Sequence, residues 1–239
     1  MELFVIPVLI LGISLGFFVQ TIAGFAAPLV ALPIMLFVQD LSEAVALMSI
    51  FFLLFSVVLV YKNWKDIDKK IVGQLAISII LGLVLGIYLL KFGNPLLLKK
   101  LLGVFIILFV VHSYFNKKKI KLFKGSGWLF GFIGGVISGL YTTSSPIFVA
   151  YLYNKLSDAK AIRATIIGIL GLVNLLRVPL MAYSDILKYD IIIKSLYILP
   201  FFLLSLYLGH VFYRKISPKA FKKILMILLL LSGISLIFR

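Results

Sequence analysis

Long apolar runs, separated by short polar and basic stretches, dominate the chain. A membrane crossing needs about 20 apolar residues. With 63% hydrophobic and only 13% charged residues, the composition predicts an all-α polytopic membrane protein, since soluble domains average about 25% charged residues. Six segments are long enough to cross, and they lie at 43–61, 71–90, 95–115, 159–181, 190–211 and 218–238.

Two further apolar regions, 3–38 and 126–154, are interrupted by polar residues and proline. A single helix over 3–38 would be roughly 54 Å long at about 1.5 Å per residue, far longer than a hydrocarbon core of about 30 Å. Proline removes a backbone donor and clashes with the preceding turn, so each helix must break near its proline. We therefore expect a broken, re-entrant-like hairpin of two limbs in each region. The residues that mark the breaks are Gly24, Pro28, Gly139 and Pro146.

The distribution of basic residues predicts the orientation. If each hairpin returns to the face from which it started, the basic loops gather on the cytoplasmic side, as the positive-inside rule requires. The net charge of +16 then indicates loops that face anionic lipid rather than a nucleic-acid partner. That side would hold 17 of the 24 Lys and Arg residues, namely Lys62, Lys65, Lys69, Lys70, Lys117, Lys118, Lys119, Lys121, Lys124, Lys155, Lys160, Arg163, Arg214, Lys215, Lys219, Lys222 and Lys223.

The two halves of the chain share one pattern. Residues 86–100 align without gaps on residues 209–223, with glycine, proline and a Lys-Lys pair at the same places. Chance similarity between leucine-rich helices is the alternative explanation. A broken hairpin and three crossings per half would make the second copy inverted in the membrane. We therefore expect two intertwined repeats, 1–115 and 125–239, joined by a basic cytoplasmic linker at 116–124.

The polar residues at the two breaks are the candidate substrate contacts. Each break would present unpaired N–H groups and the positive end of a half-helix inside the membrane, where an anion can bind. A pair of interrupted segments in corresponding positions of two halves also indicates the binding site of a transporter. The alternative is that the hydroxyls only bond to nearby carbonyls and relieve the proline kinks. The candidate residues are Gln20, Thr21, Thr142, Thr143, Ser144 and Ser145.

Arg177 is a charged residue within a predicted crossing, and Asn174 lies three residues before it on the same helical face. A charged side chain at such depth usually faces a cavity, and a guanidinium suits the edge of an oxyanion. The alternative is that Arg177, about one turn from the helix end, reaches the interface. Apart from Glu43 and Asp190, each the first residue of its segment, the predicted crossings contain no Asp or Glu, and the chain shows no metal-ligand, catalytic or P-loop pattern. We therefore expect neither an enzyme nor a cofactor.

Several short motifs occur in a defined order over nearly the whole chain. The first half has Gly24-Phe25, Pro28, Leu32-Pro33 and the run 42–46, and the second half has a glycine-rich stretch before Pro146, then Arg163-Ala164-Thr165 and Asn174 with Arg177. This order resembles the TauE/SafE family, membrane proteins associated with export of sulfite and small organosulfonates. The chain differs from many members at 141–145, which read Tyr-Thr-Thr-Ser-Ser where those members are rich in glycine.

The resemblance implies a small-anion transporter in the plasma membrane of a prokaryote. We expect export of a sulfur-containing anion, such as sulfite, sulfoacetate or a related organosulfonate, through a midplane site between two broken hairpins. The alternatives are an ion-coupled uptake carrier for an inorganic sulfur anion, an enzyme that acts on a lipid, and a non-transporting membrane scaffold. The expected partners are the anion and the lipid bilayer, not nucleic acid, and the choice between a monomer and a homodimer stays open.

Overall fold

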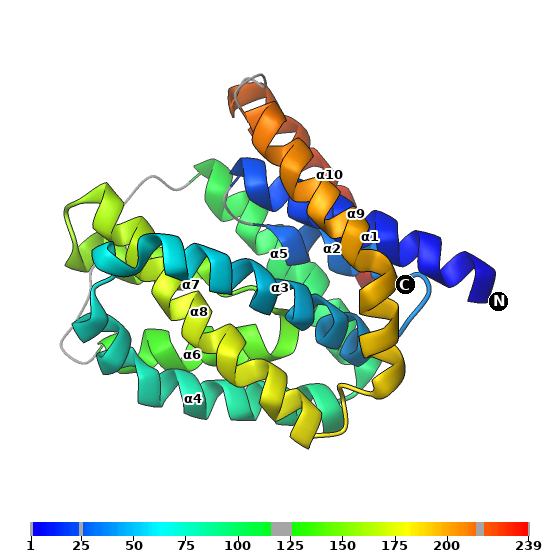
Figure 1. Ribbon diagram of the computed structural model, residues 1–239, viewed down its shortest axis with the longest axis horizontal. Coiled ribbons are helices and arrows are strands. Elements are labelled where there is room, and N and C mark those ends of the chain that lie inside the picture. Colours follow the sequence, from blue (N-terminus) through cyan, green and yellow to red (C-terminus); the bar gives the residue numbers. More distant parts are fainter. Residues whose placement is uncertain (1, 24–25, 116–125, 214–217, 239) are drawn as a thin grey trace. The chain divides into compact units, whose positions relative to one another are not determined.

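The computed structural model describes residues 2–23, 26–115, 126–213 and 218–238, which are almost entirely helical (Figure 1). Within these ranges the regular elements are ten α-helices and one short 3-10 helix. The all-α class predicted from the sequence is confirmed. The elements are α1 (Glu2–Ala23), α2 (Ala27–Met35), α3 (Leu41–Asn63), η1 (Trp64–Asp66), α4 (Lys69–Phe92), α5 (Pro95–Phe115), α6 (Ser126–Tyr141), α7 (Ser145–Lys155), α8 (Ala159–Tyr183), α9 (Tyr189–Tyr213) and α10 (Pro218–Phe238).

Five stretches of the described chain are long and apolar enough to cross a membrane. Four of them lie on predicted crossings, which supports a polytopic membrane protein. The fifth is α1, where residues expected to form one limb of a hairpin make a helix of spanning length. The predicted crossings 95–115 and 218–238 coincide with α5 and α10, whereas the predicted linker 116–124 lies outside the described residues. The five stretches are Phe4–Ala23, Leu41–Asp66, Lys69–Phe92, Ala159–Tyr183 and Tyr189–Tyr213.

Each interrupted region contains two helices. The first hairpin has a helix of 22 residues followed by one of nine, and the second has helices of 16 and 11 residues. Pro28 and Pro146, which mark the predicted breaks, lie in the first turns of α2 and α7. The physical reason is that a first-turn residue has no intrahelical partner for its N–H, so proline is tolerated there.

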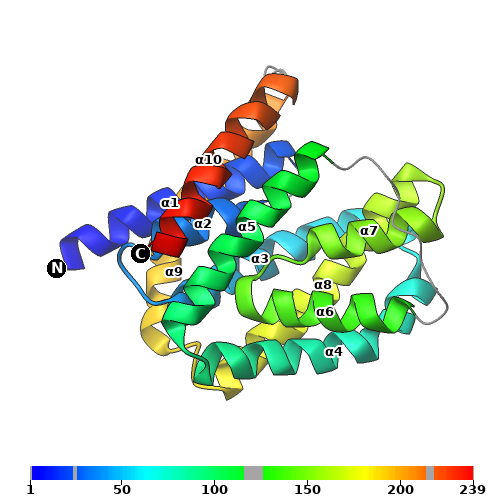
Figure 2. The ribbon, with the colours of Figure 1, turned by 180° about the vertical axis from the view of Figure 1, so that it is seen from behind.

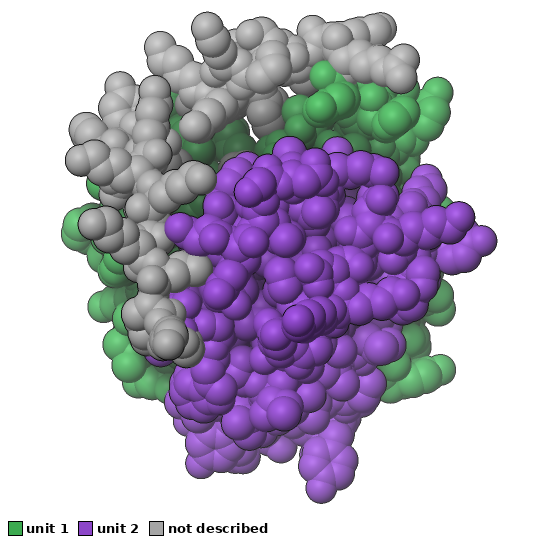
Figure 3. Space-filling model, turned by 90° about the vertical axis from the view of Figure 1, so that its left-hand side faces the viewer, with its two compact units in different colours: residues 1–45, 93–117, 189–239 green, residues 46–92, 118–188 purple. Residues whose placement is uncertain are grey.

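The chain divides into two compact units, which Figure 3 colours separately. Unit 1 comprises residues 1–45, 93–117 and 189–239, and unit 2 comprises residues 46–92 and 118–188. Unit 1 therefore contains α1, α2, α5, α9 and α10, while unit 2 contains α4, α6, α7, α8 and most of α3. Each unit thus takes helices from both of the repeats that the sequence predicts.

In unit 2, α4 and α6 run side by side along a seam of glycines (Figure 2). Gly82 and Gly86 on α4 approach the backbone of α6, and Gly135 and Gly139 on α6 approach the backbone of α4. A Cβ atom on Gly139 would lie 2.8 Å from the carbonyl oxygen of Leu83, so a side chain has no room there. Such close approach is typical of small residues between membrane helices. Gly139 therefore belongs to this seam rather than to the break for which it was predicted.

In unit 1, the first hairpin packs against α9, and α5 packs against α10. Gly16 on α1 approaches the carbonyl oxygen of Ala27 on α2, and Gly209 on α9 approaches the side chain of Thr21 on α1. A second close approach joins α5 to α10. As in unit 2, small residues allow one helix to lie directly on the backbone of another.

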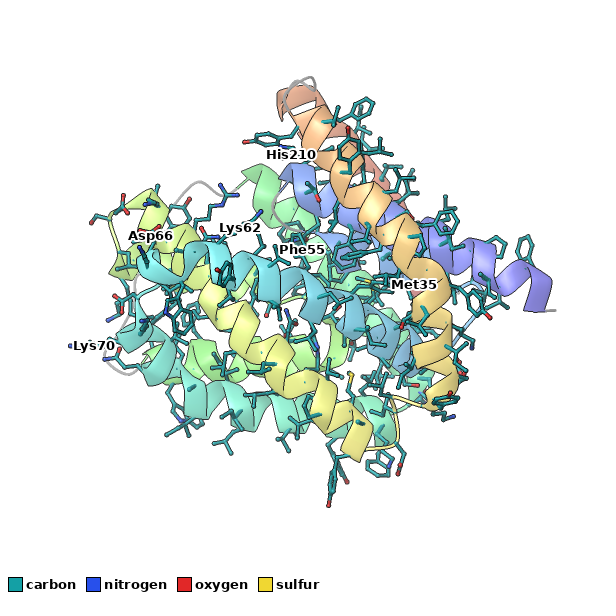
Figure 4. The ribbon with its side chains drawn as sticks, in the orientation of Figure 1. Met35, Phe55, Lys62, Asp66, Lys70 and His210 are labelled. Atoms are coloured by element: carbon teal, nitrogen blue, oxygen red, sulfur yellow. The ribbon has the colours of Figure 1, made fainter. Side chains whose placement is uncertain are left out.

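Polar contacts fasten η1 to α8 at the basic end of unit 2, where Lys62, Asp66 and Lys70 lie (Figure 4). Asp66 forms an ion pair with Lys160, with a separation of 2.9 Å between Oδ2 and Nζ. The backbone N–H of Asp68 donates to the hydroxyl of Thr165 at 3.0 Å. An exposed ion pair contributes about 0–1 kcal/mol, so these contacts position the turn rather than stabilise the whole unit.

Candidate functional site

The second hairpin breaks between the end of α6 at Tyr141 and the start of α7 at Ser145. Thr142 has a left-handed φ of 57°, a conformation that β-branched residues rarely adopt. Ser144 is the N-cap residue of α7, yet its side chain makes no capping hydrogen bond. The start of α7 therefore lacks the side-chain acceptor that commonly pairs with the free N–H groups of a helix N-terminus.

The hydroxyl groups predicted at this break are largely buried. Thr142 is 6% exposed, Thr143 is 4% exposed and Ser144 is fully buried, while Ser145 is partly buried in the first turn of α7. Thr142 donates from Oγ1 to the carbonyl oxygen of Tyr141 at 2.7 Å, as the alternative interpretation of these hydroxyls expects. Ser144 differs, because its buried Oγ has no hydrogen-bond partner within the described part of the chain. A buried hydroxyl without a partner is energetically costly, and a bound ligand would supply the missing partner.

Arg177 on α8 is buried, with only 1% of the residue exposed. The alternative in which its side chain reaches the membrane interface is therefore excluded. Its Nη1 donates to the backbone carbonyl oxygen of Ser138 at 2.9 Å and lies 3.3 Å from the hydroxyl oxygen of the same residue. Its Nη2 donates to Oδ1 of Asn174, as the shared helical face predicted from the sequence allows.

Asn174 is itself oriented by a third helix. Its Nδ2 donates to the backbone carbonyl oxygen of Phe52 on α3 at 3.3 Å. Because the amide nitrogen is used in this way, the amide oxygen is left to accept from Arg177. Helices α3, α6 and α8 of unit 2 thus meet around one guanidinium, and the chain of hydrogen bonds determines where its charge lies.

The guanidinium lies next to the break. The Ser138 carbonyl oxygen that accepts from Arg177 also accepts from the backbone N–H of Thr142 at 3.0 Å. Ser138 is in the last turn of α6, where carbonyl groups carry the partial negative charge of the helix C-terminus. A cation is favourable at that position, so Arg177 both caps α6 and brings a positive charge to the broken segment.

The charge of Arg177 has no acidic counterpart. The ion pairs formed by the described residues join Lys91 to Asp185, Lys160 to Asp66 and Lys194 to Asp190, and Arg177 is the one charged side chain among the buried residues of the described ranges. Its Nε–H group is also buried and, within the same ranges, unpaired. Burial of an uncompensated charge is costly.

At the first break, in unit 1, side chains of the hairpin form hydrogen bonds with its own backbone groups. Gln20 accepts at Oε1 from the backbone N–H of Ala27, the first residue of α2, at 3.1 Å. Thr21 donates from Oγ1 to the carbonyl oxygen of Phe17 at 2.8 Å. Ala26 has a left-handed φ of 87°, and the predicted Gly24 lies outside the described residues. Gln20 and Thr21 therefore serve the hairpin itself, in contrast to Ser144 of the second break.

Sequence reasoning missed Ser138 and the backbone carbonyl of Phe52. Ser138 has one recognisable signal, because it is a polar residue one turn before the hydroxyl cluster in an apolar helix. The carbonyl of Phe52 has no side-chain signature, and only tertiary packing brings it to Asn174. No group of three His, Asp or Glu residues within the described ranges is placed to bind a metal ion.

Comparison with known proteins gives a consistent result. The model of the sulfite exporter TauE/SafE family matches residues 8–236. A relative from Cupriavidus necator, named as a probable sulfite/organosulfonate exporter TauE, is 23% identical over 228 residues, which cover 92% of this chain and 89% of the relative. No solved structure matches the chain. With buried polar breaks, several membrane-spanning helices and a match over almost its full length, the chain belongs to the TauE/SafE family of multi-pass plasma-membrane transport proteins.

Proposed function

We propose that this protein exports a small sulfur-containing anion, sulfite or an organosulfonate, and that the anion binds at the break between α6 and α7. The observation that carries the proposal is the buried charge of Arg177, which has no acidic partner within the described ranges and bonds to the last turn of α6 at a break that also holds the unpaired hydroxyl of Ser144. The name of the family and that of the Cupriavidus necator relative support the substrate class.

Three kinds of donor would bind the oxyanion. The guanidinium of Arg177 contributes its positive charge and the Nε–H group, and charge-assisted hydrogen bonds of this kind are about twice as strong as neutral ones. Ser144 contributes a hydroxyl, and the N-terminus of α7 contributes backbone N–H groups and a partial positive charge. Thr143, also buried in the break, is the further neutral contact that we propose.

The proposal narrows the site expected from the sequence. Gln20 already accepts a hydrogen bond from the first residue of α2, so in the first hairpin this backbone donor is occupied by the protein's own amide. Arg177 and the unpaired hydroxyl both belong to unit 2. We therefore propose that the second hairpin makes the principal contacts with the anion.

The membrane potential suits export of an anion. A negative interior drives each negative charge outwards with about 2.3 kcal/mol per 100 mV. Export therefore needs no coupled cation, which agrees with the lack of Asp and Glu in the interior of the predicted crossings. An uptake carrier would have to work against this gradient and would need a coupling ion.

The test is a flux measurement on purified protein in liposomes under an imposed potential. Sulfite, methanesulfonate and chloride would be offered to the wild type, to Arg177→Gln and to Ser144→Ala. Arg163→Gln is the matched control, because Arg163 lies on the same helix but is an exposed residue near its start. We expect flux of the sulfur anions that Arg177→Gln loses and that Arg163→Gln retains. Absence of flux in the wild type for every sulfur anion would overturn the proposal.

A further inference from the structure

We infer that the site at the second break accepts anions with a single negative charge and rejects dianions. This inference rests on the proposed function, because it names the charge class of the transported species. The inference follows from the number of charges around Arg177 and from the neutrality of the groups to which its guanidinium donates hydrogen bonds.

The charge count at the break gives a single positive charge. Arg177 is the one buried charged side chain of the described ranges. The C-terminus of α6 and the N-terminus of α7 meet at this break, and their partial charges of about −0.5 and about +0.5 cancel each other. The remaining charge is therefore the single positive charge of the guanidinium.

The groups around the guanidinium do not change this count. Arg177 donates to the carbonyl and hydroxyl oxygens of Ser138 and to the amide oxygen of Asn174, all of which are neutral. Asn174 in turn donates to the neutral carbonyl of Phe52. These bonds position the cation without neutralising it, and the unpaired Nε–H group is left for a ligand.

A monovalent anion brings the buried site to neutrality, whereas a dianion leaves one negative charge without a partner. An unpaired charge in a low-dielectric site is strongly disfavoured, because neither water nor a counter-charge replaces its hydration shell. A second cation could compensate it, but within the described ranges no other Lys or Arg is buried. The site should therefore discriminate by charge between anions of nearly equal size.

The preference for monovalent anions divides the sulfur anions according to their charge. Simple alkanesulfonates such as methanesulfonate carry one negative charge at every physiological pH, whereas sulfoacetate also carries an ionised carboxylate and is a dianion that should be excluded. Sulfite exists near neutral pH as the hydrogensulfite monoanion and the sulfite dianion, so only the protonated species should bind. Sulfate is a dianion of almost the same size as methanesulfonate and should be excluded. Each transported ion then moves one negative charge across the membrane.

The experiment compares methanesulfonate, sulfate and sulfite with the wild-type protein. Binding would be measured by thermal shift in lipid nanodiscs at constant ionic strength, and flux in liposomes at a clamped potential. We expect sulfate to bind at least about 100-fold more weakly than methanesulfonate, a difference that corresponds to two tenfold steps in affinity. Sulfite flux should fall several-fold as the pH rises through the pKa of hydrogensulfite, while methanesulfonate flux stays level.

A variant tests the charge count directly. Asn174→Asp has nearly the same shape and places a carboxylate against the guanidinium, so the net charge of the site becomes zero. We expect loss of methanesulfonate binding in a variant that still folds, whereas Asn174→Gln, which keeps the amide, should retain charge selectivity.

The outcomes separate this inference from the proposed function. Sulfate that binds and crosses as well as methanesulfonate, or methanesulfonate binding that survives in folded Asn174→Asp, would overturn the inference while an exporter remains. Absence of binding and flux for all three anions would instead overturn the proposed function. The wild-type comparison needs no variant, so the inference stays testable even if Asn174→Asp does not fold.

Discussion

Arg177 donates to the backbone carbonyl oxygen of Ser138 at 2.9 Å, and this bond joins the C-terminal part of a membrane-spanning helix to the end of a broken one. The same oxygen accepts from the N–H of Thr142, where the broken helix α6 turns away. Movement of Arg177 would therefore disturb the last turn of α6, and a change at the break would disturb Arg177. If the anion binds at Arg177 as proposed, its binding should affect the conformation of the hairpin through this carbonyl.

Removal of the buried charge should separate stability from transport. Arg177→Met deletes an uncompensated cation and retains much of the volume, and replacement of buried charges by apolar residues is often neutral or stabilising by about 1–4 kcal/mol. We expect unchanged or raised thermal stability without anion, together with loss of flux. Thermal unfolding and liposome flux on the same preparation test this. A strong loss of stability would show that the arginine is chiefly structural.

Ser144→Ala should also weaken anion binding without a large loss of stability, but its effect on binding should be smaller than that of Arg177→Met. The variant removes a buried hydroxyl that has no partner in the described chain, so we expect stability to change by less than about 1 kcal/mol while anion affinity falls about tenfold. Ser205→Ala is the control, because that hydroxyl is satisfied by the carbonyl of Phe202 at 2.7 Å. Binding measured by thermal shift should separate the two variants. Equal anion affinity in both would remove Ser144 from the site.

The glycine seam of unit 2 permits a matched comparison within α4. Gly82 approaches the backbone of α6, whereas a Cβ atom on Gly73 would meet nothing within 4 Å. We expect Gly82→Ala to destabilise the protein by about 1–3 kcal/mol through overpacking, and Gly73→Ala to stabilise it by up to about 1 kcal/mol through helix propensity. Unfolding in mild detergent gives both values, and equal effects would contradict the close contact of α4 with α6.

The first break offers a test of its structural role. Gln20→Leu removes the acceptor for the N–H of Ala27 and should cost about 1–2 kcal/mol, the usual effect of a lost helix cap. Gln20→Glu keeps an acceptor oxygen at the same place and is the matched control. In both variants the ratio of methanesulfonate to sulfate affinity should equal that of the wild type. A changed ratio would show that Gln20 contacts the anion.

The polar pattern of the second break was informative because hydroxyls are unusual in an apolar run. Thr142, Thr143 and Ser144 are recognisable from their position before Pro146, and the spacing of Asn174 and Arg177 already places both on one helical face. The same pattern could not separate a ligand contact from a satisfied hydroxyl. Thr142 and Ser144 look alike in the sequence, and only packing leaves one bonded to a carbonyl and the other without a partner.

The role of the polar residues was less predictable at the first break. Gln20 and Thr21 were predicted as substrate contacts, and both lie within α1, which continues to Ala23. Thr21 bonds back to the carbonyl of Phe17 within the helix, and Gln20 reaches forward to Ala27. Both side chains satisfy backbone groups, so they allow the helix to continue to the turn instead of ending it.

From its sequence alone, this protein is predicted to be an all-α membrane protein with two broken hairpins and an arginine within a crossing, because hydrophobic length, proline and the position of a charge along an apolar segment are local properties of the chain. The tertiary structure determines which of these features contact one another. The direction of the guanidinium, its bonds to Ser138 and Asn174, and the close seam of α4 and α6 depend on contacts between segments far apart in the sequence. Such contacts follow from packing and hydrogen-bond geometry in three dimensions, which no local pattern of residues specifies.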